Sequence, residues 1–128
     1  MKGLLEAPTN ITDDYASCLS AYIIAPTTGS YTFWIASDDN GKLYLSPDAD
    51  EGNKVLIANV SGWTNSRQYD KDSYQKSSPI KLVAGNFYYI EALHKEGGGG
   101  DNLSIAWALP GYSTPLVIEG QYFQKDPQ

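Results

Sequence analysis

The chain has 128 residues, a length typical of a single domain with one core. Its 9 Lys and Arg against 15 Asp and Glu give a net charge of −6, which argues against nucleic-acid binding because that needs clustered basic side chains. No stretch approaches the ~20 apolar residues that cross a bilayer, and the N-terminus lacks the apolar core of a signal peptide. We therefore expect one monomeric domain over 1–128, excised from a longer multidomain protein, with neither nucleic acid nor an inserted membrane as a partner.

The composition favours strands and disfavours catalysis. Ten Tyr, three Trp and three Phe accompany 12 Gly and 7 Pro, as in proteins built from many short strands joined by turns. There is one His and one Cys, so the side chains that usually supply acid–base or nucleophilic chemistry are few. The lone Cys18 cannot form a disulfide within the chain. We expect a protein that is not an enzyme.

Six segments have the alternation or the short apolar runs of strands. In chain order they are Gly29–Ser37, Lys42–Leu45, Val55–Ala58, Ile80–Val83, Phe87–Leu93 and Leu103–Trp107. The first is apolar on both faces and should be a covered, central strand, and Trp34 and Trp107 should be core residues. The turn at Asp39-Asn40-Gly41 predicts a hairpin between the first two segments, because Asn and Gly tolerate positive φ.

The remaining chain offers little room for helix. Residues 63–78 carry too few large apolar side chains for a helical stripe and predict a long loop. Residues 10–25 predict a loop that runs into a strand near Tyr22. The expected fold class is therefore all-β, an antiparallel β-sandwich with little or no helix.

Two loops concentrate the oxygen ligands. Asp38 and Asp39 follow the central strand directly, and adjacent carboxylates repel unless a cation or strong donors hold them. The loop 96–102 contains four consecutive glycines, which suit either a hairpin tip or a backbone wrapped closely around a ligand. If both loops lie at one end of the sandwich, their carboxylates and carbonyls suit Ca²⁺. Solvated surface loops are the other interpretation of the same residues.

Two paired motifs give the chain a family resemblance. A "G-x-Y-x-F" strand leads into the acidic turn over 29–45, and a "hydrophobic-E-hydrophobic" strand precedes the glycine loop and a tryptophan over 89–107, with Pro110-Gly111 at the end. These motifs resemble those of the PA-fourteen domain family, named for the anthrax protective antigen. The resemblance covers most of the chain from about Tyr22 onward and implies a β-sandwich. In yeast flocculins, epithelial adhesins and bacterial adhesins such sandwiches bind sugars through Ca²⁺.

The resemblance also implies a set of ligands. Asp38 and Asp39 match the family's Asp-cis-Asp pair, Asp101 would add a carboxylate, and the carbonyls around Gly98 and Gly99 would supply the remaining protein ligands. Sugar hydroxyls would complete the Ca²⁺ shell. The chain departs from the family pattern by the insertion of Asn40, which could reshape the metal loop, and by a short stretch before Tyr22, which could leave a sheet edge open.

Other candidate residues have two interpretations each. Trp63 is either a lid on the core or a platform for a sugar ring, and His94 is either a structural, hydrogen-bonded histidine or a ligand contact. The segment 48–54 resembles the start of a calcium loop but lacks the distal Glu, so a simple turn is favoured. The Asp13-Asp14 pair predicts solvated surface.

The sequence thus supports two functional hypotheses. The first is a calcium-dependent carbohydrate-binding, lectin-like module of a secreted or cell-surface protein, a location that the resemblance implies. The second is a non-catalytic structural or interaction module in which Ca²⁺ only stabilises the loops. The identity of the sugar is left open, because the loops that would select it have no placement in the sequence.

Overall fold

The described part of the chain forms ten strands. The computed structural model describes residues 6–7, 16–38, 41–60, 64, 68–70, 73–95, 102–112, 114–118 and 122–124. The strands are β1 (Glu6–Ala7), β2 (Ala16–Ile24), β3 (Gly29–Asp38), β4 (Gly41–Leu45), β5 (Val55–Val60), β6 (Ile80–Leu82), β7 (Phe87–Lys95), β8 (Asn102–Ala108), β9 (Leu116–Val117) and β10 (Phe123–Gln124). Two 3-10 turns, η1 (Glu51–Asn53) and η2 (Ser73–Gln75), are the helical elements among these residues, and neither could cross a membrane.

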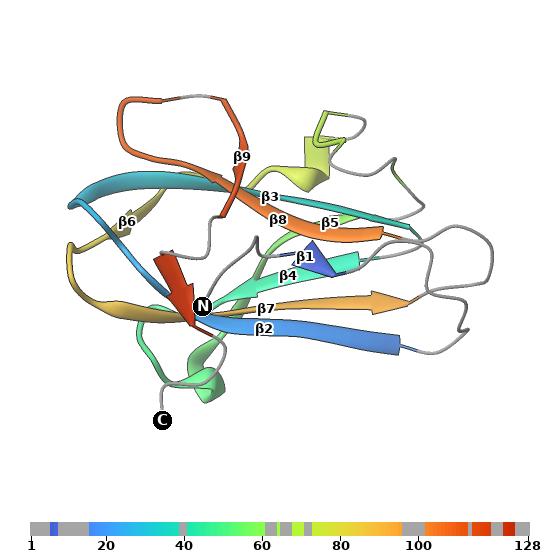
Figure 1. Ribbon diagram of the computed structural model, residues 1–128, viewed down its shortest axis with the longest axis horizontal. Helices are drawn as coiled ribbons and strands as arrows, with labels where there is room; N and C mark the ends of the chain where they lie inside the picture. Colours follow the sequence, from blue (N-terminus) through green and yellow to red (C-terminus); the bar gives the residue numbers. More distant parts are fainter. Residues whose placement is uncertain are drawn as a thin grey trace.

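The strands form two antiparallel sheets that lie face to face (Figure 1). The first sheet has the order β1-β8-β3-β6, with β9 also paired to β8. The second has the order β10-β2-β7-β4-β5. The all-β sandwich expected from the sequence is therefore confirmed.

The core lies between the two sheets and contains the aromatic rings that the alternation predicts to point inward. Tyr31, Phe33 and Trp107 come from the first sheet, and Trp107 lies 5.2 Å from the Tyr31 ring and 6.1 Å from the Phe33 ring, measured between centroids. Ile23 and Ile90 face them from the second sheet. Each fully buried side chain of this size stabilises the fold by roughly 1.5–3 kcal/mol.

The connection between β3 and β4 is not the hairpin that Asp39-Asn40-Gly41 predicts. β3 belongs to the first sheet and β4 to the second, so the chain crosses between the sheets here. The reason is that both edges of β3 are occupied: β8 pairs with one edge, and β6 together with Ser77, Gln75 and Thr64 occupies the other, which leaves no edge for β4. The glycine-rich connection from β7 to β8 also crosses between the sheets, so it is not a hairpin tip either.

The six predicted strands all form, with shifts at their ends. β2 begins at Ala16, six residues before Tyr22, because it pairs with β7 along its whole length from Ala16 to Ile24. The segment predicted as a long loop contains η2 but no strand among its described residues. The sheet edge next to β2, which the short N-terminal stretch could leave open, is paired with β10.

Candidate functional site at the loop end of the sandwich

The strand register brings the two predicted ligand loops to the same end of the molecule. Asp38 is opposite Asn102 where β3 ends and β8 begins, and Gly41 is opposite His94 where β4 begins and β7 ends. Both crossing connections, 39–40 and 96–101, therefore leave from one end, on the right in Figure 1. The sequence could not establish this, because it depends on which strands are partners.

The predicted metal ligands themselves are outside what the structure describes. Asp39, Gly98, Gly99 and Asp101 are not among the described residues, and for Asp38 only the backbone is described. The same limits apply to the two candidate sugar contacts, since Trp63 is not described and His94 is described by its backbone alone. The Asp13-Asp14 pair also lies outside the described residues. These assignments stay predictions.

The residue before Asp38 is held by a buried anchor. The backbone N–H of Thr64 donates to the Ser37 carbonyl at 2.6 Å, and the Ser37 N–H donates to the Thr64 hydroxyl at 3.0 Å. The Thr64 hydroxyl also donates to the Ser37 carbonyl at 3.3 Å. Both residues are buried, so water competes little for these bonds. The anchor fixes the end of β3 and ties the chain next to Trp63 to the same place.

The residue after the acidic turn is a glycine because of a close approach. A Cβ on Gly41 would lie 2.4 Å from the Ser37 Oγ and 2.9 Å from the Ser37 Cβ. Any other residue at this position would displace Ser37. The glycine therefore serves close packing across the turn, and the same buried Ser37 supports both ends of the acidic loop.

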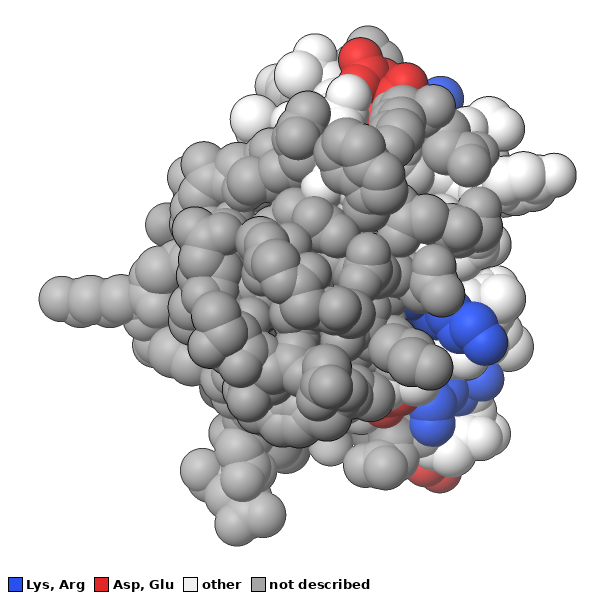
Figure 2. All heavy atoms as spheres, turned by 90° about the vertical axis from the view of Figure 1, so that its right-hand side faces the viewer, with Lys and Arg blue, Asp and Glu red and all other residues white. Residues whose placement is uncertain are grey.

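Charged side chains of the described residues lie at the margins of this end. Figure 2 looks directly at it, with Lys side chains gathered along one margin and acidic side chains near the top and bottom of the view. Among the described residues, no cluster of three or more His, Cys, Asp or Glu could hold a metal ion.

The 48–54 segment forms a self-contained turn. The Asp48 Oδ1 accepts from the Ser46 hydroxyl at 2.9 Å and from the Asp50 N–H at 2.9 Å, and the Asp50 Oδ1 accepts from the Gly52 N–H at 2.9 Å. The backbone bond from Asp50 and the side-chain bond from Ser46 lower the pKa of Asp48 below its ordinary value. The carboxylates of Asp48 and Asp50 therefore accept hydrogen bonds from within the loop, in agreement with the simple turn that the sequence favours.

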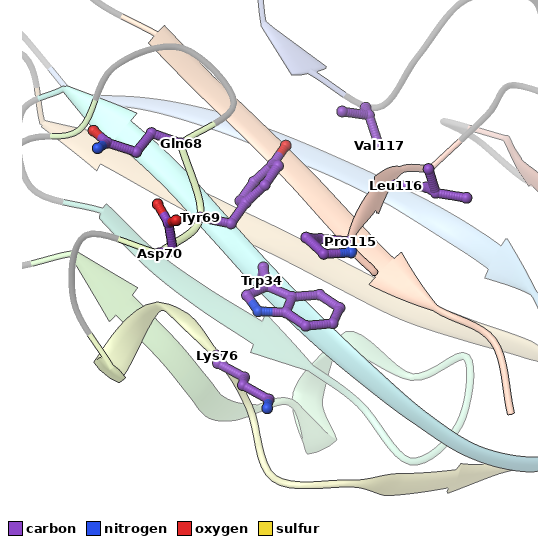
Figure 3. A pocket seen from close by; sticks show the side chains of 8 residues that line it. All are labelled: Trp34, Gln68, Tyr69, Asp70, Lys76, Pro115, Leu116 and Val117. Atoms are coloured by element: carbon purple, nitrogen blue, oxygen red, sulfur yellow. The ribbon is translucent and has the colours of Figure 1, made fainter. Parts of the chain in front are cut away.

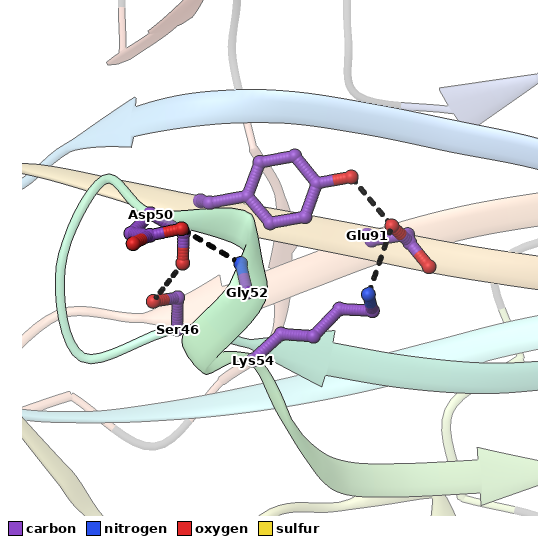
Figure 4. A network of polar contacts seen from close by, with 6 residues as sticks. Ser46, Asp50, Gly52, Lys54 and Glu91 are labelled. Carbon is purple, nitrogen blue, oxygen red and sulfur yellow. Dashed lines mark hydrogen bonds and ion pairs between the residues drawn. The ribbon is translucent and has the colours of Figure 1, made fainter.

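A glutamate on the outer face of the second sheet anchors this turn to the sheet (Figure 4). Glu91 is 8% exposed, accepts from the Tyr89 hydroxyl at 2.5 Å, and lies 4.0 Å from the Lys54 ammonium. Lys54 also lies 6.0 Å from the centroid of the Tyr44 ring. The glutamate of the "hydrophobic-E-hydrophobic" motif therefore has a structural partner on this face.

Trp107 is in the core as predicted, whereas Trp34 lies on the opposite face of its sheet. Trp34 is 6% exposed and forms a small cluster with Ala106 and Ala108, against which Tyr69 packs. The apolar alternation on both faces of β3 had indicated that this outer face would be covered. The cover comes from residues 68–70 and 73–77, which belong to the segment predicted as a long loop.

The fold and the loop end define a class: a two-sheet antiparallel β-sandwich with two loops crossing between the sheets at one end. A PA14 domain model matches residues 4–121. The chain belongs to the PA14 domain family, the family that the sequence motifs resemble.

Relatives with curated descriptions include two vertebrate proteins. Fibrocystin of Canis lupus familiaris is 36% identical over an 83-residue alignment that covers 59% of this chain and 2% of that protein. N-acetyl-beta-glucosaminyl-glycoprotein 4-beta-N-acetylgalactosaminyltransferase 1 of Mus musculus is 33% identical over a 111-residue alignment that covers 81% of this chain and 11% of that protein. The chain thus spans a small part of each of these relatives.

Solved structures share the fold at low sequence identity. The Epithelial Adhesin 9 A domain of Candida glabrata, solved with Galb1-4GlcNAc, has a TM-score of 0.64 at 20% identity, covering 87% of this chain and 52% of that one. The PA14 sugar-binding domain of an RTX adhesin has a TM-score of 0.56 at 15% identity, covering 88% of this chain and 56% of that one. At these identities the similarity shows the fold.

Proposed function

We propose that this PA14 domain is a calcium-dependent carbohydrate-binding module of a secreted or cell-surface protein. Ca²⁺ would be held by the carboxylates of Asp38, Asp39 and Asp101 and by the carbonyls of Gly98 and Gly99. The observation that carries the proposal is the register that places Asp38 opposite Asn102 and thereby brings both ligand loops to one end. Relatives with this fold that were solved with glycans support it.

The chemistry of the loops fits a hard cation. Ca²⁺ takes 6–8 oxygen ligands in a flexible geometry, and protein carboxylates with backbone carbonyls leave positions for two neighbouring sugar hydroxyls. The net charge of −6 favours a cation over an anion near the domain. Extracellular Ca²⁺ modules work at dissociation constants of roughly 10⁻⁴–10⁻³ M, which suits a surface location.

The described residues supply the support for such a site. The buried anchor between Ser37 and Thr64 would hold the carboxylate at Asp38 in place before the metal arrives, which lowers the cost of ordering the loop. Trp63 precedes the anchoring Thr64, and His94 is the β7 residue paired with Gly41. We assign Trp63 to stacking on the sugar and His94 to a polar contact with it. Binding of this kind needs no catalytic group.

Calorimetry tests the proposal with the protein as it is. The titrants are lactose and Galb1-4GlcNAc, and they are replaced by other sugars if a preceding glycan array finds tighter binding. Each titration is done in Ca²⁺ and then in EDTA. We expect binding in Ca²⁺, loss in EDTA, and loss in Asp38→Asn. Asp50→Asn is the matched control, because Asp50 is an exposed acidic residue of a different loop. Thr64→Val should weaken binding while the Thr64 backbone bond to Ser37 persists.

Two results would overturn the proposal. Sugar binding at the loop end that is unchanged by EDTA and by Asp38→Asn would remove the metal from the mechanism. A melting temperature that rises with Ca²⁺, together with an array in which no glycan binds, would identify the domain as a structural module whose loops Ca²⁺ only stabilises.

A further inference from the structure

A pocket of about 590 Å³ opens on the outer face of the first sheet (Figure 3). Trp34 lies in its middle, the segment 68–70 and Lys76 border it on one side, and residues 115–117 border it on the other. Trp34 is four residues before Asp38 on β3, so the pocket lies roughly 13 Å along the strand from the loop end. It is therefore separate from the site proposed above.

The pocket exists because small side chains surround one large ring. On the outer face, Trp34 is paired with Ala106 and Thr32 with Ala108 across the β3–β8 ladder. Two segments cover this face: an isolated bridge joins Lys76 to Trp34, and β9 pairs with β8. The alanines are too short to fill the space between these two segments, so a hollow stays open above the strands.

The aromatic part of the pocket is fixed in place. The Tyr69 hydroxyl is 2.8 Å from the Ser104 Oγ, which sets the direction of the Tyr69 ring beside Trp34. Trp34 is 94% buried, and its indole N–H has no hydrogen-bond partner among the residues that the structure describes. Buried donors are nearly always paired with an acceptor, so this N–H calls for an oxygen from a bound molecule or water.

The border of the pocket carries one charge of each sign. Asp70 and Lys76 are both exposed, and in Figure 3 Asp70 lies above Trp34 and Lys76 below it, on the same side of the pocket. An anionic ligand would meet the Asp70 carboxylate and a cationic one the Lys76 ammonium, so neither sign is favoured. A neutral ligand rich in hydroxyls can donate to the carboxylate and accept from the ammonium at the same time.

We infer that this pocket is a second saccharide site, which binds one neutral pyranose ring without a metal. The C–H face of a pyranose is weakly positive and would pack against the half-buried ring of Tyr69, since Trp34 is only 6% exposed. The hydroxyls of the pyranose match the Asp70 carboxylate, the Lys76 ammonium and the Trp34 indole N–H. The volume is within the range of small-molecule sites, which are mostly apolar with a few placed polar groups.

Nuclear magnetic resonance in EDTA tests this site apart from the loop end. The ¹⁵N-labelled protein is titrated with glucose, galactose, mannose, N-acetylglucosamine and lactose at millimolar concentrations. We expect at least one of them to shift the Trp34 indole resonance, assigned by its absence in Trp34→Phe, and to do so equally in Asp38→Asn. Asp70→Ala and Lys76→Ala should each weaken that binding at least tenfold, because a neutral ligand loses one hydrogen bond to a charged group in each case.

The control is Lys81→Ala, an exposed lysine on β6 that does not line the pocket. It should bind as the unchanged protein does. The inference is overturned if none of the five sugars moves the Trp34 indole resonance. It is also overturned if Asp70→Ala binds the sugar as tightly as the unchanged protein does. Failure of the calcium site leaves this titration unaffected, since EDTA is present throughout, so the two proposals fail separately.

Discussion

The outer faces of the two sheets are both covered by loops, but the two covers are attached differently. The chain that covers the first sheet is attached along one edge of β3, by buried hydrogen bonds to its backbone carbonyls: Thr64 N–H to Ser37 O at 2.6 Å, Gln75 Nε2 to Ile35 O at 2.9 Å, and Ser77 N–H to Phe33 O at 2.8 Å. Over the second sheet, the 46–54 loop is attached through its backbone bonds to Tyr89 and through the Lys54–Glu91 ion pair at 4.0 Å.

The difference follows from the strands underneath. β3 is apolar on both faces, so its outer face must be covered. The covering chain also supplies hydrogen bonds to the backbone groups along the edge of β3. The outer face of β7 carries Tyr89 and Glu91, and a polar cover with partly exposed contacts is enough there. A buried hydrogen bond is costly to break, whereas an ion pair with a partly exposed lysine at 4.0 Å contributes little. The chain that covers the first sheet, which we call the first cover, is therefore needed for the stability of the fold. The Lys54–Glu91 ion pair, which attaches the 46–54 loop to the second sheet, is dispensable for that stability.

Truncation of the tryptophan beneath the first cover should have the largest effect on stability. Trp34→Ala removes a nearly buried ring from its cluster with Ala106 and Ala108 and should lower the free energy of unfolding by about 3–5 kcal/mol. Urea denaturation followed by circular dichroism measures this. Tyr112→Ala is the control, because Tyr112 is exposed and should cost less than about 0.5 kcal/mol. Equal effects of the two substitutions would show that the first cover is not integral to the fold.

Removal of a buried amide within the first cover should have the next largest effect. The Gln75 side chain is fully buried and donates to the carbonyls of Ile35 and Gln68, at 2.9 Å and 2.6 Å. Gln75→Ala leaves two carbonyls without that donor and should cost about 2–4 kcal/mol in the same denaturation experiment. Ser73→Ala, an exposed change in the same turn, should be nearly neutral. A cost below about 1 kcal/mol would contradict the comparison.

Loss of the ion pair on the second sheet should matter much less. Lys54→Met keeps most of the aliphatic side chain but removes the ammonium near Glu91, and it should cost less than about 1 kcal/mol. A double-mutant cycle with Glu91→Gln isolates the pair from other effects of each change. A coupling energy of about 2 kcal/mol or more would place this attachment on a par with those over the first sheet.

The smallest expected effect depends on pH. The pKa of Asp48 is lowered in the fold, mainly by the Asp50 N–H, so its carboxylate stabilises the folded state above the ordinary value of 3.8, and that contribution disappears as the pH falls through the lowered pKa. Asp48→Asn should therefore be less stable than the unchanged protein at about pH 7, with a difference that shrinks towards about pH 2.5. Urea midpoints at both pH values measure it. A difference that grows as the pH falls would have the wrong sign.

Strand positions were predictable because alternation is a local property. The alternation and the short apolar runs of side chains correctly predicted six strands, β3 to β8. The two-residue strands β1, β9 and β10 were not predicted, since two residues carry no period. The early start of β2 was also missed, because pairing with β7 extends the strand over residues that carry no strong pattern of their own.

The candidate site divides in the same way. The acidic pair and the glycine loop were visible as motifs, and so was the family that they indicate. The support beneath them was not visible: Thr64 is 27 residues from Ser37, and no local pattern links the two. The hollow above Trp34 was equally hidden, since Ala106 and Ala108 are ordinary strand residues until the register places them around a large ring.

The sequence by itself determined the all-β class, most of the strands and the family, because each depends on composition or on short motifs, and it predicts the residues that would bind a metal. Only the tertiary structure decided that the two connections cross between the sheets instead of forming hairpins, and that they do so at one end. Both outcomes depend on which strand edges are already occupied, and strand pairing joins residues far apart in the chain, which local patterns do not encode.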